Sequence, residues 1–268
     1  MSSSAAPDGY EAAELRGAII VVRRGQLDAV RTALESGTLY EYAARHQASR
    51  SLSGRGIAYA APLPNGERVV VRHNRHGGLL APLTGDRFVA PTRAPYELTT
   101  ALRLESAGVP TPKIVAYAVY PAGLLLRRSD VASREILDSS DLAAVLTTGS
   151  LNERRTSLES AAGLIGLLSA SGARHHDLNL KNILLSRTAE RGDLPVAYVL
   201  DVDRVEFGRP GDSRVTERNL DRFARSARKW RELHGARIEE AELVRVAASV
   251  RRFVSSRPSS GARAITRS

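Results

Sequence analysis

The chain has 268 residues, 43% of them hydrophobic and 25% charged, a size and composition typical of one large globular domain or two small lobes. We expect neither a membrane-spanning helix nor a secretion signal, and the absence of cysteine excludes disulfides and thiolate metal sites, as in a reducing cytoplasm. The net charge of +10 favours anionic partners, but without a zinc-finger or RNP-type signature we do not expect nucleic acid among them.

Residues 14–127 predict a β-rich N-terminal lobe, preceded by a Ser- and Ala-rich tail at 1–13 that we expect to be disordered. Asn65-Gly66 is a hairpin turn signal, and Gly108 ends a segment with the apolar spacing of a helix. The helical pattern at residues 27–46 has no assigned role. The strand-like runs lie at 18–22, 57–61, 68–72, 114–120 and 124–127, and the helical patterns at 27–46 and 96–107.

From about residue 128 the pattern becomes mainly helical, and residues 128–255 predict a C-terminal lobe. Residues 256–268 are expected to be a second disordered tail. The combination predicts an α+β, bilobal protein-kinase-like fold with a β-rich N-terminal lobe and a helical C-terminal lobe. Helices are expected at 158–171, 214–233 and 239–254.

The most informative segment reads H-x-D-L-x-x-x-N from His175 to Asn182 and runs into the apolar residues 183–185. This is the arrangement of a kinase catalytic loop. Asp177 would accept or orient the proton of an attacking hydroxyl group, and Asn182 would hold Mg²⁺ next to the nucleotide phosphates. His175 is expected to support the loop backbone.

A second acidic element follows the strand-like residues 196–200. It begins with Asp201, at the place where kinases carry the metal-binding Asp of D-F-G. Asp203 is either a helper or a surface residue. The two elements, in this order and each beside a strand, indicate a kinase that uses ATP and Mg²⁺.

A kinase also needs a cation on the N-terminal lobe to bind the nucleotide phosphates, and an acidic partner to hold that cation. No lysine occurs before Lys113, so the usual residue is missing. The best replacement is Arg72, whose planar guanidinium group suits phosphate, with Glu97 as its partner. The alternative is that Arg72 is a surface residue at a strand end.

Two loops could contact anionic groups. Gly54 and Gly56 lie in a serine-bearing turn where backbone N–H groups could approach phosphates, although an ordinary hairpin turn would look the same. The second loop, residues 72–80, carries Arg75 and His76 before Gly77-Gly78 and could hold an anionic acceptor. Its alternative is a solvated loop.

The predicted helix at 218–230 has two faces. The apolar face consists of Leu220, Phe223, Ala227 and Trp230, and the cationic face of Arg218, Arg222, Arg225 and Lys229. One interpretation is a surface for the anionic head of a glycolipid or for an anionic membrane. The other is a core-packed helix with a solvated basic side.

Four separate segments resemble the lipopolysaccharide core kinase family, and within it the 3-deoxy-D-manno-octulosonic acid (Kdo) kinases. They cover roughly residues 50–230. Asn74 and His76 depart from the first motif, and Lys181 precedes Asn182, so the exact acceptor stays open. The segments are R-H-x-R-x-G-G-L from Arg72, Y-E-L from Tyr96 with A-G-V-P-x-P from Ala107, H-x-D-L-N-x-x-N-I-L-L from His175, and N-L-x-R-F-x-R-S-x-x-K from Asn219.

The resemblance implies ATP- and Mg²⁺-dependent phosphorylation of the 4-OH of Kdo on a lipid A precursor. It implies a cytoplasmic enzyme bound peripherally to the inner face of a Gram-negative-type inner membrane. The open alternatives are another small-molecule or protein Ser/Thr kinase, and a catalytically dead kinase-like module that binds glycolipid. Residues that could contact the anionic glycolipid are Arg75, His76, Lys181, Arg222 and Arg225.

Overall fold

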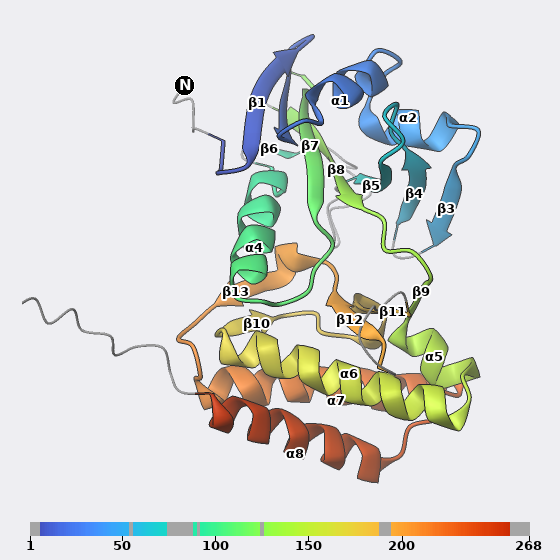
Figure 1. Ribbon diagram of the computed structural model, residues 1–268, viewed down its shortest axis with the longest axis vertical. Helices are drawn as coiled ribbons and strands as arrows, with labels where there is room; N and C mark the ends of the chain where they lie inside the picture. The colour runs from blue at the N-terminus through green and yellow to red at the C-terminus, as the bar shows by residue number, and fades with distance from the viewer. Residues whose placement is uncertain are drawn as a thin grey trace, which may run out of the picture. The chain divides into compact units, whose positions relative to one another are not determined.

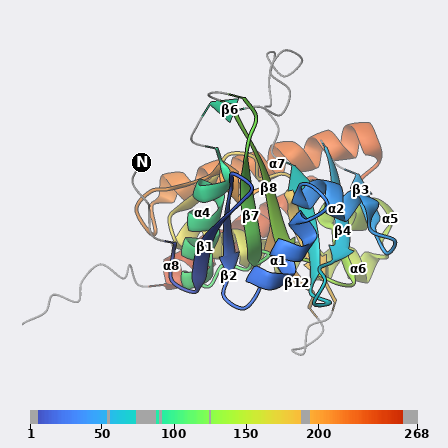
Figure 2. The same ribbon diagram turned by 90° about the horizontal axis from the view of Figure 1, so that it is seen from above.

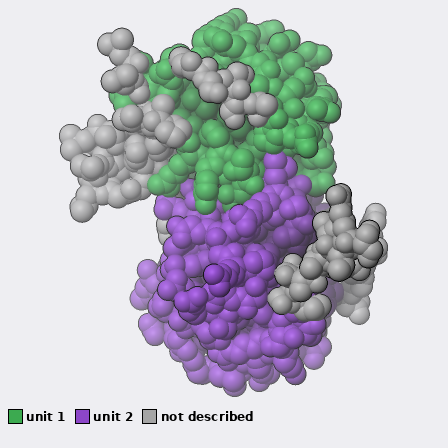
Figure 3. Space-filling view, turned by 90° about the vertical axis from the view of Figure 1, so that its left-hand side faces the viewer, with its two compact units in different colours: residues 1–101, 112–135 green, residues 102–111, 136–268 purple. Residues whose placement is uncertain are grey.

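The computed structural model describes residues 6–53, 56–73, 88–89, 92–123, 126–187 and 194–257. The chain forms two compact units, which are described separately below. Unit 1 consists of residues 1–101 and 112–135, and unit 2 of residues 102–111 and 136–268 (Figure 3).

Unit 1 is built on an antiparallel sheet of strand order β1-β2-β7-β8-β5-β4-β3, with β6 paired to β8 (Figure 1). The hairpin expected at Asn65-Gly66 joins β4 to β5, and Gly66 adopts the positive φ of +85° that such a turn requires. The strands are β1 (Tyr10–Leu15), β2 (Ala18–Arg23), β3 (Arg50–Ser53), β4 (Ile57–Pro62), β5 (Arg68–His73), β6 (Phe88–Val89), β7 (Ile114–Pro121) and β8 (Leu126–Arg134).

The expected domain boundaries need two corrections. The predicted tail 1–13 is wrong for its described part, because β1 pairs with β2 along its whole length and the buried Tyr10 hydroxyl donates a 2.6 Å hydrogen bond to the Ile114 carbonyl. The lobe boundary at 127/128 falls inside β8, whose pairing with β5 and β7 keeps the chain in unit 1 as far as Glu135. Residues 1–5 and 258–268 lie outside the described residues.

The helical pattern at 27–46 forms two helices, α1 (Leu27–Leu34) and α2 (Leu39–Arg45). The chain between them is held by a capping box, in which Thr38 accepts a hydrogen bond from the Glu41 N–H and Glu41 accepts one from the Thr38 N–H. Both helices lie on one face of the sheet (Figure 1, Figure 2), and their apolar side chains pack against it. This core includes Ile20, Val22, Val30, Leu34, Leu39, Val69, Val71 and Ala116.

Unit 2 is mainly helical, with α6, α7 and α8 stacked against one another (Figure 1). A three-stranded sheet of order β12-β11-β9 and a β10–β13 ribbon complete it. None of the helices in the described ranges has the length and apolarity to cross a bilayer. The helices are α5 (Leu142–Thr148), α6 (Leu151–Ala170), α7 (Ser213–His234) and α8 (Glu240–Ser256), and the strands are β9 (Ser139–Asp141), β10 (Ala173–His175), β11 (Ile183–Ser186), β12 (Val196–Val199) and β13 (Val205–Phe207).

A glycine fixes the turn from α6 into β10. Gly172 has a φ of +75°, and a Cβ atom there would lie 2.6 Å from the Gly208 carbonyl oxygen. Only glycine satisfies both conditions. The close approach brings β10 beside β13 and directs the chain into the segment that begins at His175.

Candidate active site

The H-x-D-L-x-x-x-N segment forms a compact loop between β10 and β11. Asn179 closes it, because its side-chain oxygen accepts hydrogen bonds from the N–H groups of Lys181 and Asn182 at 2.9 and 3.1 Å. The Asn182 amide group in turn donates to the Asp177 carbonyl at 2.8 Å. The loop backbone is therefore held at both of the positions expected to carry the chemistry, Asp177 and Asn182.

His175 supports this loop from beneath, as the sequence predicted. Its ring is buried, with Nδ1 accepting from the Asp177 N–H at 3.1 Å and Nε2 lying 2.9 Å from the Leu200 carbonyl oxygen. These contacts suit a neutral imidazole that carries its proton on Nε2. Burial holds the pKa of His175 below its ordinary value, partly offset by the Leu200 carbonyl.

The lowered pKa of His175 predicts acid sensitivity of the fold. The unfolded chain binds a proton at His175 more readily than the folded chain, so its stability contribution is complete above about pH 6.5 and is lost as the pH falls below that. We expect the free energy of unfolding to fall by up to about 1.4 kcal/mol per pH unit from this group. Urea unfolding of the wild type and His175→Gln at pH 5.0–7.5 measures it. Equal pH slopes for the two proteins would contradict the prediction.

Helix α7 anchors the loop through side chains spaced three and four residues apart. Asn219, fully buried, accepts from the His175 N–H at 3.0 Å and donates to the Ala173 carbonyl at 2.9 Å. Ser226 accepts from the Leu180 N–H at 3.1 Å. Between them Arg222 forms an ion pair with the Asp177 carboxylate. The N-L-x-R-x-x-R-S pattern is visible in the sequence, but nothing local in it indicates that these side chains anchor the loop.

The apolar face of α7 therefore packs in the core, and part of its cationic face lies at the surface. Leu220, Phe223 and Ala227 are buried in the core, as the core-packed alternative expected. On the cationic side, Arg222 is committed to Asp177, whereas Arg225 and Lys229 are exposed. Trp230, the fourth residue of the apolar face, is half-buried. Most of the apolar face is thus not available to a membrane.

Asp201 begins the second acidic element in a strained backbone conformation. Its φ of +53° and ψ of +48° are left-handed, which non-glycine residues rarely adopt and which often marks functional positions. The neighbouring Leu200 N–H donates to the Asn182 carbonyl at 2.9 Å, and Ile183 pairs with Val199. The β11–β12 hairpin thus brings Asn182 and Asp201 to the same end.

This end of the hairpin fits Mg²⁺. The Asn182 side chain donates through its nitrogen, which leaves its amide oxygen directed elsewhere, and Asp201 adds an exposed carboxylate. Amide and carboxylate oxygens suit a hard cation, and Mg²⁺ at nucleotide sites needs only one or two protein ligands. Among the residues described, no group of three acidic, His or Cys side chains could hold a metal ion.

The strain at Asp201 predicts a stability difference between two substitutions. Asp201→Gly relieves the left-handed conformation, whereas Asp201→Ala retains it, so we expect the glycine variant to be more stable by about 1 kcal/mol. Both variants lose the carboxylate and should lose phosphotransfer. Thermal unfolding of the two proteins measures the difference, and an alanine variant at least as stable as the glycine variant would argue against strain.

Three further polar residues near the catalytic loop have partners within unit 2. Lys181, one of the residues expected to contact the glycolipid, forms a 3.0 Å ion pair with Asp141, the N-cap of α5. Asp203 is half-buried and lies 3.7 Å from the Arg204 guanidinium group. His176 pairs with Glu206 at 2.8 Å, and the pKa of Glu206 is lowered mainly by that hydrogen bond.

In unit 1 the expected ion pair between Arg72 and Glu97 is present. Arg72 lies on β5 opposite Ala58 of β4, and Glu97 lies on α4 (Ala94–Ser106) with only 4% of its surface exposed. A carboxylate this deeply buried needs a cation beside it. The pair thus holds the Arg72 guanidinium group in a fixed position.

The two loops expected to contact anions are only partly described. Gly56 is exposed between β3 and β4, so its turn does precede the strand that carries Arg72. An added Cβ at Gly56 would meet nothing within 4 Å, so packing does not explain a glycine there. Gly54, Arg75 and His76 lie outside the described residues.

Sequence reasoning missed a buried polar network next to Arg72. Asp130 of β8 is fully buried, lies opposite His73 in the register and contacts its Nδ1 at 2.5 Å. The other Asp130 oxygen accepts from the Tyr40 N–H at 3.0 Å, at the start of α2. Burial, together with the Asp130 charge, raises the pKa of the Tyr120 phenol, which accepts from the Leu39 N–H. The network fastens α2 to the strand of Arg72.

Kinases position the accepting hydroxyl group and the metal-bound nucleotide with the same sequence of catalytic loop, hairpin and acidic residue. The protein is accordingly a phosphotransferase with an α+β, kinase-like fold. A solved structure described as "WaaP in complex with acyl carrier protein" shares this fold with a TM-score of 0.53 and 17% identity, covering 88% of this chain and 92% of the other.

The chain belongs to the lipopolysaccharide kinase (Kdo/WaaP) family, whose model matches residues 42–253. It is 28% identical over 182 residues to a 3-deoxy-D-manno-octulosonic acid kinase of Photobacterium damsela subsp. piscicida, covering 66% of this chain and 70% of that one. It is 29% identical over 198 residues to the kinase of the same name from Mannheimia succiniciproducens, covering 72% and 79%. The protein is therefore an ATP-dependent sugar kinase of lipopolysaccharide biosynthesis.

Proposed function

We propose that this kinase transfers the γ-phosphate of ATP to the 4-OH of Kdo on a lipid A precursor. The observation that carries the proposal is the anchored loop, in which Asp177 is held by Arg222 and His175 on a scaffold typical of phosphotransfer. The two related kinases are both 3-deoxy-D-manno-octulosonic acid kinases, which supports Kdo as the sugar.

Asp177 would act on the acceptor. Its carboxylate would orient the sugar hydroxyl group and accept its proton as the oxygen bonds to the γ-phosphorus and the bond to the ADP oxygen breaks. Arg222 keeps this carboxylate in one place, and the buried His175 keeps its backbone fixed. Arg222 is thus a positioning residue in this proposal, in contrast to the expected direct contact with substrate.

The nucleotide would be bound by charge. Arg72, fixed by Glu97, would donate to the phosphates, with the turn at Gly54 and Gly56 as a further candidate contact. Asn182 and Asp201 would hold Mg²⁺, which when bound neutralises the phosphate oxygens.

The glycolipid and the membrane are expected to meet cationic side chains. Arg225 and Lys229 are exposed on the same helix that anchors the catalytic loop, and the net charge of +10 attracts anionic lipid. We propose a cytoplasmic location with salt-sensitive, peripheral binding to the inner face of the inner membrane. Co-sedimentation with anionic vesicles at 50 and 500 mM salt tests this part.

The deciding experiment is Mg²⁺-dependent transfer of labelled phosphate from ATP to a Kdo-lipid A precursor. We expect the label on the 4-OH, located by NMR of the product, and labelling about 10³-fold slower with Asp177→Asn. ATP hydrolysis that depends on Asp177 without transfer to this acceptor would discard the Kdo assignment and keep the kinase. A protein that binds the glycolipid but not ATP would indicate a catalytically dead module.

A further inference from the structure

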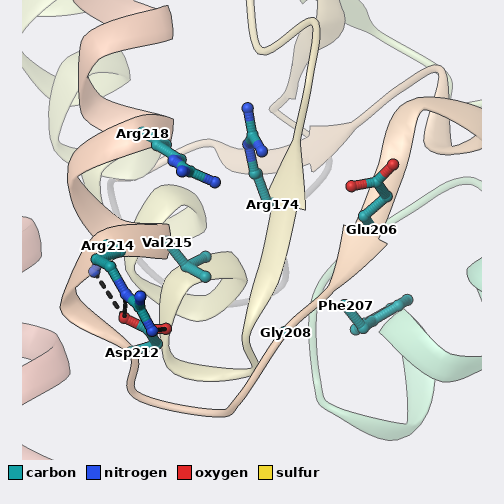
Figure 4. Close-up of a pocket in the computed structure, with 8 residues that line it drawn as sticks. All are labelled: Arg174, Glu206, Phe207, Gly208, Asp212, Arg214, Val215 and Arg218. Carbon is teal, nitrogen blue, oxygen red and sulfur yellow. Dashed lines mark hydrogen bonds and ion pairs between the residues drawn. The ribbon is translucent and has the colours of Figure 1, made fainter.

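A pocket of about 310 Å³ in unit 2 takes no part in the arrangement described above. It lies between the first turns of α7 and the β10–β13 ribbon (Figure 4). Arginines border it from both sides: Arg174 comes from β10, and Arg214 and Arg218 come from α7. The guanidinium groups of Arg174 and Arg218 point into the same space (Figure 4).

The acidic groups at the pocket already have partners. Asp212 binds the Arg214 guanidinium group at 3.1 Å and also accepts from the Arg214 N–H at the start of α7. Glu206 is hydrogen-bonded to His176 at 2.8 Å. Within the described ranges, by contrast, Arg174 and Arg218 form no ion pair and no side-chain hydrogen bond. Glu206 lies opposite Arg174 in the register of the ribbon, and the charge of Arg174 helps to lower the pKa of Glu206. Three arginines and two carboxylates line the pocket, so its lining is net positive.

Helix α7 links the pocket to the Asp177 carboxylate. Arg218 and Arg222 are four residues apart, so they share a face of α7 and are separated by about 6 Å along its axis. Arg222 contacts Asp177. Arg174 directly precedes His175 on β10, and successive side chains of a strand point to opposite faces, so the link to Asp177 runs through α7. The pocket therefore begins one helical turn from the arginine that positions Asp177.

We propose that Arg174 and Arg218 bind an oxyanion of the acceptor, either its carboxylate or a phosphate group, and thereby select acidic sugars. The inference rests on the proposed function, because it concerns the acceptor of that reaction. The planar guanidinium group binds both kinds of oxyanion through two parallel hydrogen bonds. Arg214, held by Asp212, would form the wall of the site.

The test is steady-state kinetics of the Arg174→Gln/Arg218→Gln protein. We expect the KM for the Kdo-lipid A precursor to rise at least tenfold, with the KM for ATP unchanged and kcat within about threefold. Arg252→Gln, an exposed arginine of α8 remote in sequence, is the matched control and should behave like the wild type. If the thermal midpoint of the double variant is lower than that of the wild type, the single variant Arg218→Gln, at an exposed position, replaces it in the assay.

Modified acceptors then identify the oxyanion. The wild type is assayed with two modified forms of the Kdo-lipid A precursor, the carboxyl methyl ester and the dephosphorylated lipid. The modification that removes the bound oxyanion should raise the KM of the wild type as much as the double substitution does. It should cause no further rise in the double variant. The subsite would be overturned if the KM for the acceptor were unchanged in the variants. It would also be overturned if each modified acceptor raised the KM of the double variant as much as it raises that of the wild type. A wild type that transfers no phosphate to any of these acceptors would instead refute the proposed function.

Discussion

Asp177→Asn should lower kcat for phosphotransfer by about 10³-fold, within the range of 10²–10⁴-fold typical of a lost general base. The amide has the same shape as the carboxylate and can still accept a hydrogen bond from Arg222, but it cannot take up the hydroxyl proton. The KM for ATP should change little, because Asp177 serves the acceptor. Single-turnover transfer at saturating ATP measures the effect.

Two comparisons show whether the loss is chemical. The thermal midpoint of Asp177→Asn should remain close to that of the wild type, since the backbone bonds to His175 and Asn182 are untouched. Arg222→Gln should lower kcat only about tenfold, as expected for a residue that positions the carboxylate. If Arg222→Gln were as inactive as Asp177→Asn, the arginine would itself contact the reacting groups.

Arg72→Ala should lower kcat/KM for ATP by about 10²-fold, equivalent to about 2.7 kcal/mol of lost charge-assisted hydrogen bonding to phosphate. Arg72→Lys keeps the charge but loses the planar fork, so a smaller loss of about tenfold is expected. The alanine variant should also be less stable by about 2–4 kcal/mol, because the buried Glu97 carboxylate loses its cation. Initial-rate kinetics at varied ATP and urea unfolding measure the two effects.

A paired substitution separates nucleotide binding from folding. Replacing the ion pair by two apolar residues, Arg72→Met with Glu97→Leu, removes the buried charge and should restore most of the stability. It should not restore affinity for ATP. Recovery of ATP binding in this double variant would show that Arg72 acts through the fold alone.

The parts of this site that are contiguous in sequence could be predicted from local patterns. The catalytic loop was predictable because His175, Asp177 and Asn182 lie within eight consecutive positions before a strand. The partnership of Arg72 and Glu97 followed from the lack of any earlier lysine and from the helix expected around Glu97. These inferences needed only element types and spacing.

Contacts between distant residues were not predictable in this way. Asn219 meets His175 across 44 positions, and His73 meets Asp130 across 57, so nothing local in the sequence pairs them. Strand β1 was missed for a different reason. Its residues Glu11–Glu14 are helix-favouring Glu and Ala, and they become a strand because β2 pairs with them and Tyr10 is anchored to β7.

The β1–β2 hairpin has a practical consequence for work with this enzyme. Similarity to the family begins at residue 42, yet β2 is bonded to β7 from Ile19 to Val22. A chain shortened to the matched residues would leave β7 with a row of unpaired amides, and the apolar face under α1 would be uncovered. Such an edge pairs readily with strands of other molecules. Shortened versions should therefore aggregate, and the limit of recognisable similarity is not the limit of the folding unit.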